Sequence, residues 1–184
     1  MPLHPNELRA TPAYPPRSTG NENMLDDSPP GSHALRSLRI YFAGSIRGGR
    51  DLVHRYRSIV VMIESMGHTV LTKHVADPKL TAQTDRSQPE HVYRRDMNWL
   101  HSADAIIAEV SVPSLGVGFE LGIASELGKP VLCLFDSRRQ IQKLSHLVRG
   151  VERDRFYTRT YVRTSELRRM ISDFLEEQVE AKEH

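Results

Sequence analysis

Short apolar segments alternate along the chain with longer segments whose apolar side chains recur at helical spacing. The segments predicted to be strands are residues 38–43, 69–72, 105–110 and 130–135, followed by a weaker one at 157–163. The segments predicted to be helices are 51–66, 90–102, 118–127, 139–149 and 165–180. Strands and helices that alternate in this order are typical of a parallel sheet with helices on its faces.

The expected fold is therefore α/β, a single doubly wound domain at residues 37–184 with about five parallel strands flanked by helices. This architecture is Rossmann-like or flavodoxin-like. Because crossover connections are right-handed, the loops at the carboxyl ends of the strands should form the binding site. We expect chemistry in the loops that follow residues 43, 72, 110 and 135.

Residues 1–36 lack a hydrophobic period and are rich in Pro, Ser, Asn and charged side chains. The proline pairs Pro15-Pro16 and Pro29-Pro30 would break a helix or a strand. We therefore expect a disordered leader, which is either a passive extension or a targeting or regulatory tail.

Composition and charge exclude several kinds of function. The chain of 184 residues has a formal net charge of +2, which is too balanced to indicate a nucleic-acid or membrane surface. No apolar run approaches the roughly 20 residues that a membrane-spanning helix needs. Cys133 is the only cysteine, so no intramolecular disulfide can form, which fits a reducing compartment. We expect a cytoplasmic protein, with the nucleus as a second location, that acts on a small molecule.

The loop after the first strand, Gly44–Arg50, has the composition of an anion-binding turn. Its glycines allow the backbone to approach an oxyanion closely, Ser45 adds a hydroxyl donor, and Arg47 and Arg50 add positive charge. The spacing matches neither the Walker motif nor the dinucleotide-binding glycine motif. A structural turn without a ligand is the alternative interpretation.

The loop after the third strand, Ser114–Gly122, carries the most specific signal because a glycine-rich turn there delivers one carboxylate. We expect Glu120 in the first turn of a helix, where backbone N–H groups stabilise negative charge and keep it ionised. Such a carboxylate beside an anion site indicates a nucleophile that acts on a phosphorylated substrate. The alternative is a glutamate that only stabilises the helix, by about 0.3–1 kcal/mol. In a doubly wound sheet this loop and Gly44–Arg50 can be neighbours, which favours a site.

Three further polar residues have weaker signals on their own. His74, after the second strand, could contact a base or act as an acid, although a lone histidine is more often structural. Asp96 either points at the strand ends or pairs with Arg94 or Arg95 in solvent. Ser145 lies on the polar edge of a predicted packing helix, which suggests a subunit contact.

Six ordered segments together resemble the nucleoside 2-deoxyribosyltransferase superfamily over residues 38–150. The segments are Tyr41–Arg50, Leu71–Val75, Asp96–Leu100, Pro113–Gly122, Leu132–Phe135 and Leu144–Gly150. The resemblance implies cleavage of the N-glycosidic bond of a 2′-deoxynucleoside 5′-monophosphate, which yields free base and 2-deoxyribose 5-phosphate. It also implies a homodimer with composite sites and no metal or organic cofactor. No His, Cys or Asp spacing in the sequence suggests a metal site either.

The resemblance further implies roles for individual residues. Glu120 is the nucleophile at the anomeric carbon and forms a glycosyl ester that water resolves, a reaction whose oxocarbenium-like transition state needs an anion beneath it. Asp96 orients Glu120 and assists proton transfer, and Tyr41 positions the nucleophile or the sugar. The implied substrate-binding residues are Gly44, Ser45, Ile46, Arg47, Gly48, Gly49, Arg50, Ile59, His74, Ser114, Gly116, Glu120, Ser145, His146 and Leu147.

Within this set the resemblance assigns three regions. His74 contacts the base or the pocket wall, and Ile59 lines the pocket. Ser145 reaches the phosphate from the second subunit. The residues around the phosphate are Ser45, Arg47, Gly48, Gly49 and Ser114.

One position separates hydrolysis from transfer within the superfamily. Deoxyribosyltransferases carry an acidic residue six positions before the nucleophile, where it binds the free 5′-hydroxyl, and here that position is Ser114. A carboxylate would repel a phosphate, whereas a hydroxyl can donate to it. Ser114 therefore favours the hydrolase branch and a monophosphate substrate.

Three alternatives stay open. The nearest is a transferase that moves deoxyribose between bases through the same ester intermediate. The second is a nucleotide 5′-monophosphate phosphoribohydrolase of the cytokinin-activating type, which needs a Pro-Gly-Gly-x-Gly-Thr segment that this chain lacks. The third is a non-catalytic nucleotide sensor, which binds a monophosphate without releasing its base.

Overall fold

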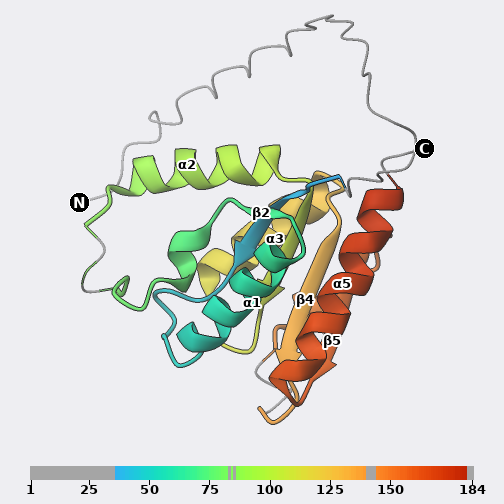
Figure 1. Ribbon diagram of the computed structural model, residues 1–184. Coiled ribbons are helices and arrows are strands. Elements are labelled where there is room, and N and C mark those ends of the chain that lie inside the picture. The colour runs from blue at the N-terminus through green and yellow to red at the C-terminus, as the bar shows by residue number, and fades with distance from the viewer. Residues whose placement is uncertain (1–35, 83, 85, 140–143, 182–184) are drawn as a thin grey trace, which may run out of the picture. The chain divides into compact units, whose positions relative to one another are not determined.

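The computed structural model describes residues 36–82, 84, 86–139 and 144–181. The predicted leader lies outside these residues except for Arg36, so its expected disorder stays a prediction. Figure 1 shows the arrangement of the elements. They are, in chain order, β1 (Arg39–Ala43), α1 (Val53–Ser65), β2 (Thr69–Val70), η1 (Lys73–Ala76), α2 (Pro89–Ser102), β3 (Ala105–Glu109), α3 (Leu115–Glu126), β4 (Val131–Asp136), α4 (His146–Arg149), β5 (Phe156–Tyr161) and α5 (Thr164–Glu180).

The five strands form one parallel sheet in the order β2-β1-β3-β4-β5. The doubly wound parallel sheet expected from the sequence is therefore confirmed (Figure 1). The chain runs outward from β1 to β2 and then returns to the other side of β1, where Ile40 lies opposite Ala105 of β3. This reversal is the switch point at which doubly wound sheets bind their ligands.

Apolar side chains on both faces of the sheet hold the helices in place. On one face Ile107 belongs to a buried cluster with Ile59 of α1 and Ile171 of α5. On the opposite face Ile106 belongs to a second cluster, which includes Leu121 of α3. β4 is buried along its whole length, as expected for an inner parallel strand that is covered on both sides.

The start of α3 differs from the prediction in a way that matters for the site. The helix begins at Leu115, three residues earlier than expected, because Ser114 occupies the capping position and its Oγ accepts the Val117 N–H at 3.5 Å. Glu120 therefore lies in the second turn of the helix, and the expectation of a first-turn position was wrong. The end of the helix follows the prediction, with Gly128 at φ +63°.

The second strand is also shorter than predicted. β2 stops at Val70, and the predicted strand residue Thr72 precedes η1 instead. The Thr72 side chain replaces the backbone hydrogen bonds that a longer strand would make. Its Oγ1 donates to the Phe42 carbonyl at 2.6 Å and accepts the Phe42 N–H at 2.9 Å. One buried hydroxyl thus satisfies two backbone groups at the end of β1.

The helix predicted at 139–149 appears, among the described residues, only as the single turn of α4, and residues 140–143 lie outside them. Ser145 comes directly before this turn, not within it, because the turn starts at His146. Within the described ranges every helix is too short or too polar to span a bilayer.

Candidate active site

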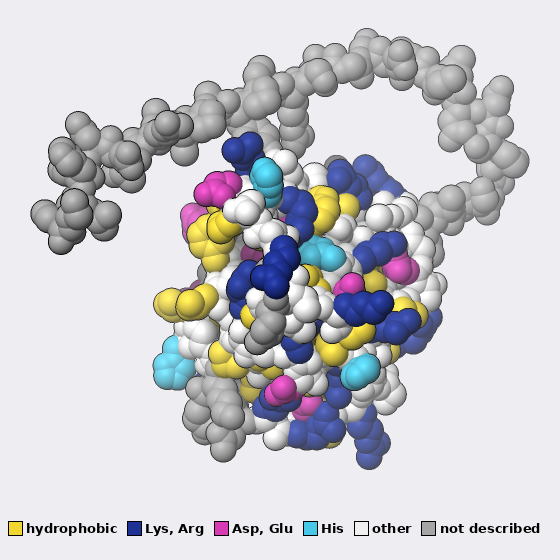
Figure 2. Space-filling model, turned by 90° about the vertical axis from the view of Figure 1, so that its left-hand side faces the viewer, with side chains coloured by type: hydrophobic (Ala, Val, Ile, Leu, Met, Phe, Trp, Pro, Cys, Tyr) yellow, Lys and Arg dark blue, Asp and Glu magenta, His cyan; other side chains and the backbone are white. Residues whose placement is uncertain are grey.

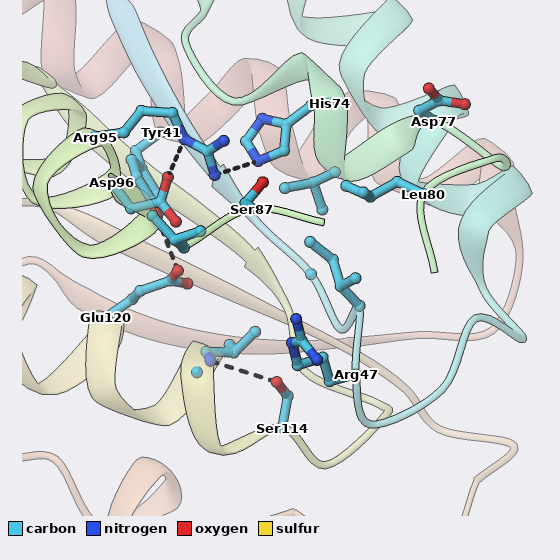
Figure 3. Close-up of a pocket in the computed structure, with 16 residues that line it drawn as sticks. Tyr41, Arg47, His74, Asp77, Leu80, Ser87, Arg95, Asp96, Ser114 and Glu120 are labelled. Atoms are coloured by element: carbon cyan, nitrogen blue, oxygen red, sulfur yellow. Dashed lines mark hydrogen bonds and ion pairs between the residues drawn. The ribbon is translucent and has the colours of Figure 1, made fainter. Parts of the chain in front are cut away.

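A cavity of about 330 Å³ opens at the switch point of the sheet (Figure 3). Four parts of the chain line it, namely β1 with its following loop, the segment from η1 to residue 87, helix α2, and the start of α3. The lining residues are Tyr41, Gly44, Ile46, Arg47, His74, Val75, Asp77, Leu80, Ser87, Val92, Arg95, Asp96, Ser114, Gly116, Val117 and Glu120. All three predicted catalytic residues are among them.

A short hydrogen bond joins two of these residues across the switch point. The hydroxyl of Tyr41 on β1 donates to Oε1 of Glu120 on α3 at 2.8 Å. Tyr41 is 2% exposed, and burial, followed by the negative charges of Glu120 and Asp96, raises the pKa of its phenol. Tyr41 therefore remains a hydrogen-bond donor at any physiological pH, and its position fixes one oxygen of Glu120.

The environment of Glu120 changes the expected charge of its carboxyl group. Burial raises its pKa to about 7, and the nearby charge of Asp96 acts in the same direction, while the Tyr41 hydrogen bond opposes them. The expectation that Glu120 stays ionised at neutral pH was wrong, because it assumed a first-turn position among free backbone N–H groups. Near pH 7 the carboxyl group is instead poised between its two protonation states.

Asp96 combines the two alternatives that the sequence left open. It lines the cavity, and its Oδ1 accepts a hydrogen bond from Arg95 Nε at 2.8 Å. The side chain of Asp96 is only 15% exposed, so this ion pair is not a solvated surface pair. Arg95 Nη2 also contacts His74 Nε2 at 3.1 Å, which extends the polar chain from α2 to η1 (Figure 3).

The two glycine-containing loops lie against each other, as the switch-point argument predicts. A Cβ atom at Gly48 would come within 2.3 Å of the Pro113 carbonyl oxygen, so only glycine allows this approach. Gly49 has φ +130°, a conformation that side-chain-bearing residues rarely adopt. Arg47 of the first loop and Ser114 of the second face the same end of the cavity (Figure 3).

Some residues of the first loop stabilise its conformation and do not line the cavity. The guanidinium of Arg50 donates to the backbone carbonyls of Ser45 at 3.0 Å and Asp77 at 2.6 Å. Ser45 is fully buried, its N–H donates to the Tyr56 hydroxyl, and its Oγ has no hydrogen-bond partner among the described residues. Arg50 therefore acts as a brace between two loops, and Gly48 and Gly49 shape the turn.

Besides Ser45, Gly48, Gly49 and Arg50, four further predicted substrate-binding residues lie outside this cavity. Ile59 lies on the inner face of α1 and is fully buried in the core. Ser145 and Leu147 line a separate, largely apolar hollow of about 460 Å³ beside Ser114, and His146 is exposed next to them. Within a single chain the structure thus does not bring Ser145 to the carboxylates.

Apart from Asp96, sequence reasoning missed the part of the cavity wall formed by α2 and the segment before it. Val92, Arg95 and Asp96 follow one another at helical spacing, so the helical period could have placed all three on one face. Leu80 and Ser87 belong to a segment without a hydrophobic period, so their positions have no such signal.

A buried carboxyl group for which the sequence suggests no role supports the second loop. Glu109, at the end of β3, accepts hydrogen bonds from the Ser111 hydroxyl and from the Tyr161 hydroxyl, the latter at 2.8 Å. Burial raises the pKa of Glu109. Ser111 Oγ in turn accepts the Asp136 N–H at 2.7 Å, so the start of the loop that leads to Ser114 is tied to β4 and β5.

The described residues contain no group of three or more His, Cys, Asp or Glu side chains placed to hold a metal ion. The ionisable groups that line the cavity are the carboxyl groups of Asp77, Asp96 and Glu120, the phenol of Tyr41, the imidazole of His74 and the guanidinium groups of Arg47 and Arg95.

The fold and the cavity define an α/β protein with a pair of carboxyl groups at its switch point, and comparison with known proteins assigns its family. The model of the nucleoside 2-deoxyribosyltransferase family matches residues 40–178. The 5-hydroxymethyl-dUMP N-hydrolase of Tetraodon nigroviridis is 40% identical over 144 residues, which are 77% of this chain and 99% of that protein. The protein of the same name from Mus musculus is 40% identical over 156 residues, 83% of this chain and 82% of that protein.

The chain therefore belongs to the nucleoside 2-deoxyribosyltransferase family, which confirms the resemblance and the expectation of an enzyme. Among solved structures, the CMP N-glycosidase BcmB of Clostridium botulinum matches with a TM-score of 0.54 at 20% identity. That match covers 73% of this chain and 98% of BcmB and shows a shared fold.

The raised pKa of Glu120 predicts a stability cost that depends on pH. The folded-state pKa of about 7 lies above the ordinary 4.5, so stability falls as the pH rises from about 4.5 to about 7 and then levels off. Replacing Glu120 by Gln removes this cost, because glutamine carries no charge at any pH. We expect Glu120→Gln to raise the Tm at pH 8 by several degrees and to lose this advantage near pH 5.

Thermal unfolding at pH 5 and pH 8, followed by circular dichroism, measures both effects. Glu126→Gln is the matched control, because Glu126 lies on the same helix, is exposed and pairs with Arg153. If Glu120→Gln is no more stable than wild type at pH 8, or is stabilised equally at both pH values, the pKa of Glu120 is not raised in the folded protein.

Proposed function

We propose that this protein hydrolyses the N-glycosidic bond of 2′-deoxynucleoside 5′-monophosphates to free base and 2-deoxyribose 5-phosphate. The observation that carries the proposal is the cavity with carboxyl groups on one side and anion-binding groups at one end. Glu120, Asp96 and Tyr41 form the first group, and Arg47 and Ser114 belong to the second. The relatives from Tetraodon nigroviridis and Mus musculus are named for the same reaction on a deoxynucleoside monophosphate, 5-hydroxymethyl-dUMP.

In the proposed mechanism the ionised form of Glu120 attacks the anomeric carbon. Its free oxygen forms a bond to C1′ while the C1′–N bond breaks, and Tyr41 holds the other oxygen in place. Water then hydrolyses the glycosyl ester and restores the carboxylate. Asp96, on the same side of the cavity, orients Glu120 and assists proton transfer, and its charge disfavours ionisation of Glu120 before substrate binds.

The phosphate is proposed to bind at the start of α3. Backbone N–H groups at a helix N-terminus attract anions, and Gly116 keeps this approach open. Arg47 adds a positive charge at the same end of the cavity. Lys and Arg side chains also predominate over acidic ones on the face shown in Figure 2, which favours the approach of an anionic substrate.

We also propose that two copies form a homodimer through the apolar hollow beside Ser114. Leu115 and Leu147 are 96% and 86% exposed, and both line the hollow. Apolar side chains gathered at this exposure indicate a surface that a partner covers. In a two-fold dimer through this face, Ser145 of one copy can approach the phosphate end of the other copy's cavity, since Ser114 borders both hollows.

Replacing the nucleophile provides the central test. We expect Glu120→Ala to lower base release by at least about 1,000-fold while the affinity for dGMP or dUMP changes by less than about tenfold. Chromatography of released base and titration calorimetry measure the two quantities, and Glu126→Ala is the control on the same helix. Near wild-type turnover in Glu120→Ala would show that another group attacks.

The ester intermediate has its own readout. In the presence of methanol, two successive displacements give a methyl deoxyriboside 5-phosphate with retained configuration, whereas one direct displacement gives the inverted product.

Substitution of the capping serine tests the phosphate. Aspartate also caps helices well, so Ser114→Asp should fold normally. Its negative charge should lower kcat/KM for a deoxynucleoside monophosphate by at least about 100-fold, and for the corresponding nucleoside by less than about tenfold. An equal loss of kcat/KM on both substrates would show that the phosphate does not bind at this end of the cavity.

The wild-type protein separates the alternative functions in one assay. Faster base exchange than hydrolysis, with unphosphorylated nucleosides preferred, identifies a transferase. Faster release of base from ribonucleoside monophosphates than from deoxynucleoside monophosphates identifies a phosphoribohydrolase. Tight monophosphate binding without base release identifies a sensor.

Mixing two inactive variants tests the composite site. Ser145→Asp should repel the phosphate in the neighbouring copy's site, and Glu120→Ala removes the nucleophile. Random exchange of subunits then gives heterodimers with one intact site each, which restores about a quarter of wild-type activity. If the mixture is no more active than the separate variants, the site is not shared between copies.

The interface has a test of its own. Leu147→Glu places a charge in the apolar hollow, so we expect this variant to sediment as a monomer.

A further inference from the structure

Arg95 is held on three sides at the wall of the cavity. Its Nε donates to Asp96 Oδ1 at 2.8 Å and its Nη2 contacts His74 Nε2 at 3.1 Å. Its guanidinium carbon lies 5.0 Å from the centre of the Trp99 ring, in a cation–π arrangement. The side chain is nevertheless 37% exposed, so a clamped cation faces the cavity at a fixed place.

The contact with His74 defines the state of the histidine ring. A guanidinium only donates hydrogen bonds, so His74 Nε2 accepts and carries no hydrogen. His74 is then the neutral tautomer with its hydrogen on Nδ1, and Arg95 supplies the positive charge of this wall. The two contacts with Asp96 and His74 use two of the five guanidinium N–H bonds.

The position of Arg95 relative to the proposed substrate follows from the cavity. Arg47 and Ser114 lie at one end, and Arg95 and His74 lie at the other, with Glu120 at the side wall (Figure 3). A nucleotide with its phosphate at the first end and its C1′ at Glu120 directs its base toward Arg95. This placement rests on the proposed function.

Bases leave in two electronically different ways. When the C1′–N1 bond of a uracil-type base breaks, its electron pair stays on the base and spreads over O2 and O4, and water later supplies the proton. Those oxygens are acceptors that match guanidinium donors. A purine departs most easily after it gains a proton on N7, and a nearby cation opposes that protonation.

We propose that Arg95 is a catalytic residue that stabilises the negative charge on a departing 4-oxo-pyrimidine base, and thereby makes the enzyme selective for such bases. The interaction is stronger in the transition state than in the bound substrate, because the charge on the base develops only as the bond breaks. Asp96 and Trp99 hold the guanidinium in place, so little reorganisation accompanies the reaction.

A series of leaving groups tests the proposal. The substrates are 5-bromo-dUMP, 5-fluoro-dUMP, dUMP and dTMP, whose bases leave with increasing difficulty, together with dGMP. For Arg95→Gln we expect kcat/KM to fall by about 100-fold on dTMP but only about tenfold on 5-bromo-dUMP, so that its dependence on leaving-group pKa becomes steeper. Activity on dGMP should change by less than about threefold. Arg95→Lys, which keeps the charge but loses the planar fork, should give an intermediate slope.

Arg94→Gln is the matched control, since Arg94 is the exposed neighbour on the same helix and does not line the cavity. An equal loss on all five substrates, with an unchanged slope, would show that Arg95 only positions Asp96 and would overturn the proposal. An unchanged rate on dTMP would overturn it as well. These outcomes differ from failure of the proposed function, in which the wild-type protein releases base from none of the five.

Discussion

The parallel pairing of β1 with β3 is the constraint on which the site depends. Ala43 lies opposite Ala108, which is 65 residues later in the chain, so the carboxyl ends of the two strands come side by side. That pairing brings Tyr41 within a hydrogen bond of Glu120 and presses the first loop against Pro113. The chain leads from β1 to β2 on one side of β1 and returns to β3 on the other side. The helices therefore cover the two faces of the sheet and leave the carboxyl ends of β1 and β3 open.

The position of Glu120 shows how a site and a stable fold make opposing demands. A carboxyl group placed in the second turn of α3, largely buried and near Asp96, is easier to protonate than one in water. In the proposed reaction the same position brings a negative charge close to a carbon that becomes positive during glycosidic cleavage. The Tyr41 hydrogen bond limits the cost and gives the carboxyl group a single orientation.

Much of the fold could be predicted from the sequence because its signals are local. The apolar strand segments and the helical periods of α1, α2 and α5 depend on neighbouring residues, and the structure has these elements within a few positions of the prediction. The convergence of Tyr41, Asp96 and Glu120 in one cavity could be expected because strand-end loops meet at a switch point.

Other properties depend on packing that no local pattern encodes. The protonation of Glu120 depends on where α3 starts and on burial, and the orientation of Arg50 depends on two carbonyl groups that belong to different loops. The sequence does not distinguish Arg94 from Arg95 as a partner of Asp96, and the contacts of Arg95 with His74 and Trp99 depend on tertiary packing. In the proposed dimer, the distance of Ser145 from the phosphate also depends on how a second copy of the chain packs, which no local pattern encodes.

The Arg50 brace has a mechanical consequence. One guanidinium donates hydrogen bonds to the carbonyls of Ser45 and Asp77. It therefore links the turn at one end of the cavity to the segment that borders its other end. A shift of the first loop toward an anion would therefore also displace Asp77, which lines the cavity in the segment that leads to Leu80. The two ends of a nucleotide would in this way be sensed together, through a side chain that touches neither of them.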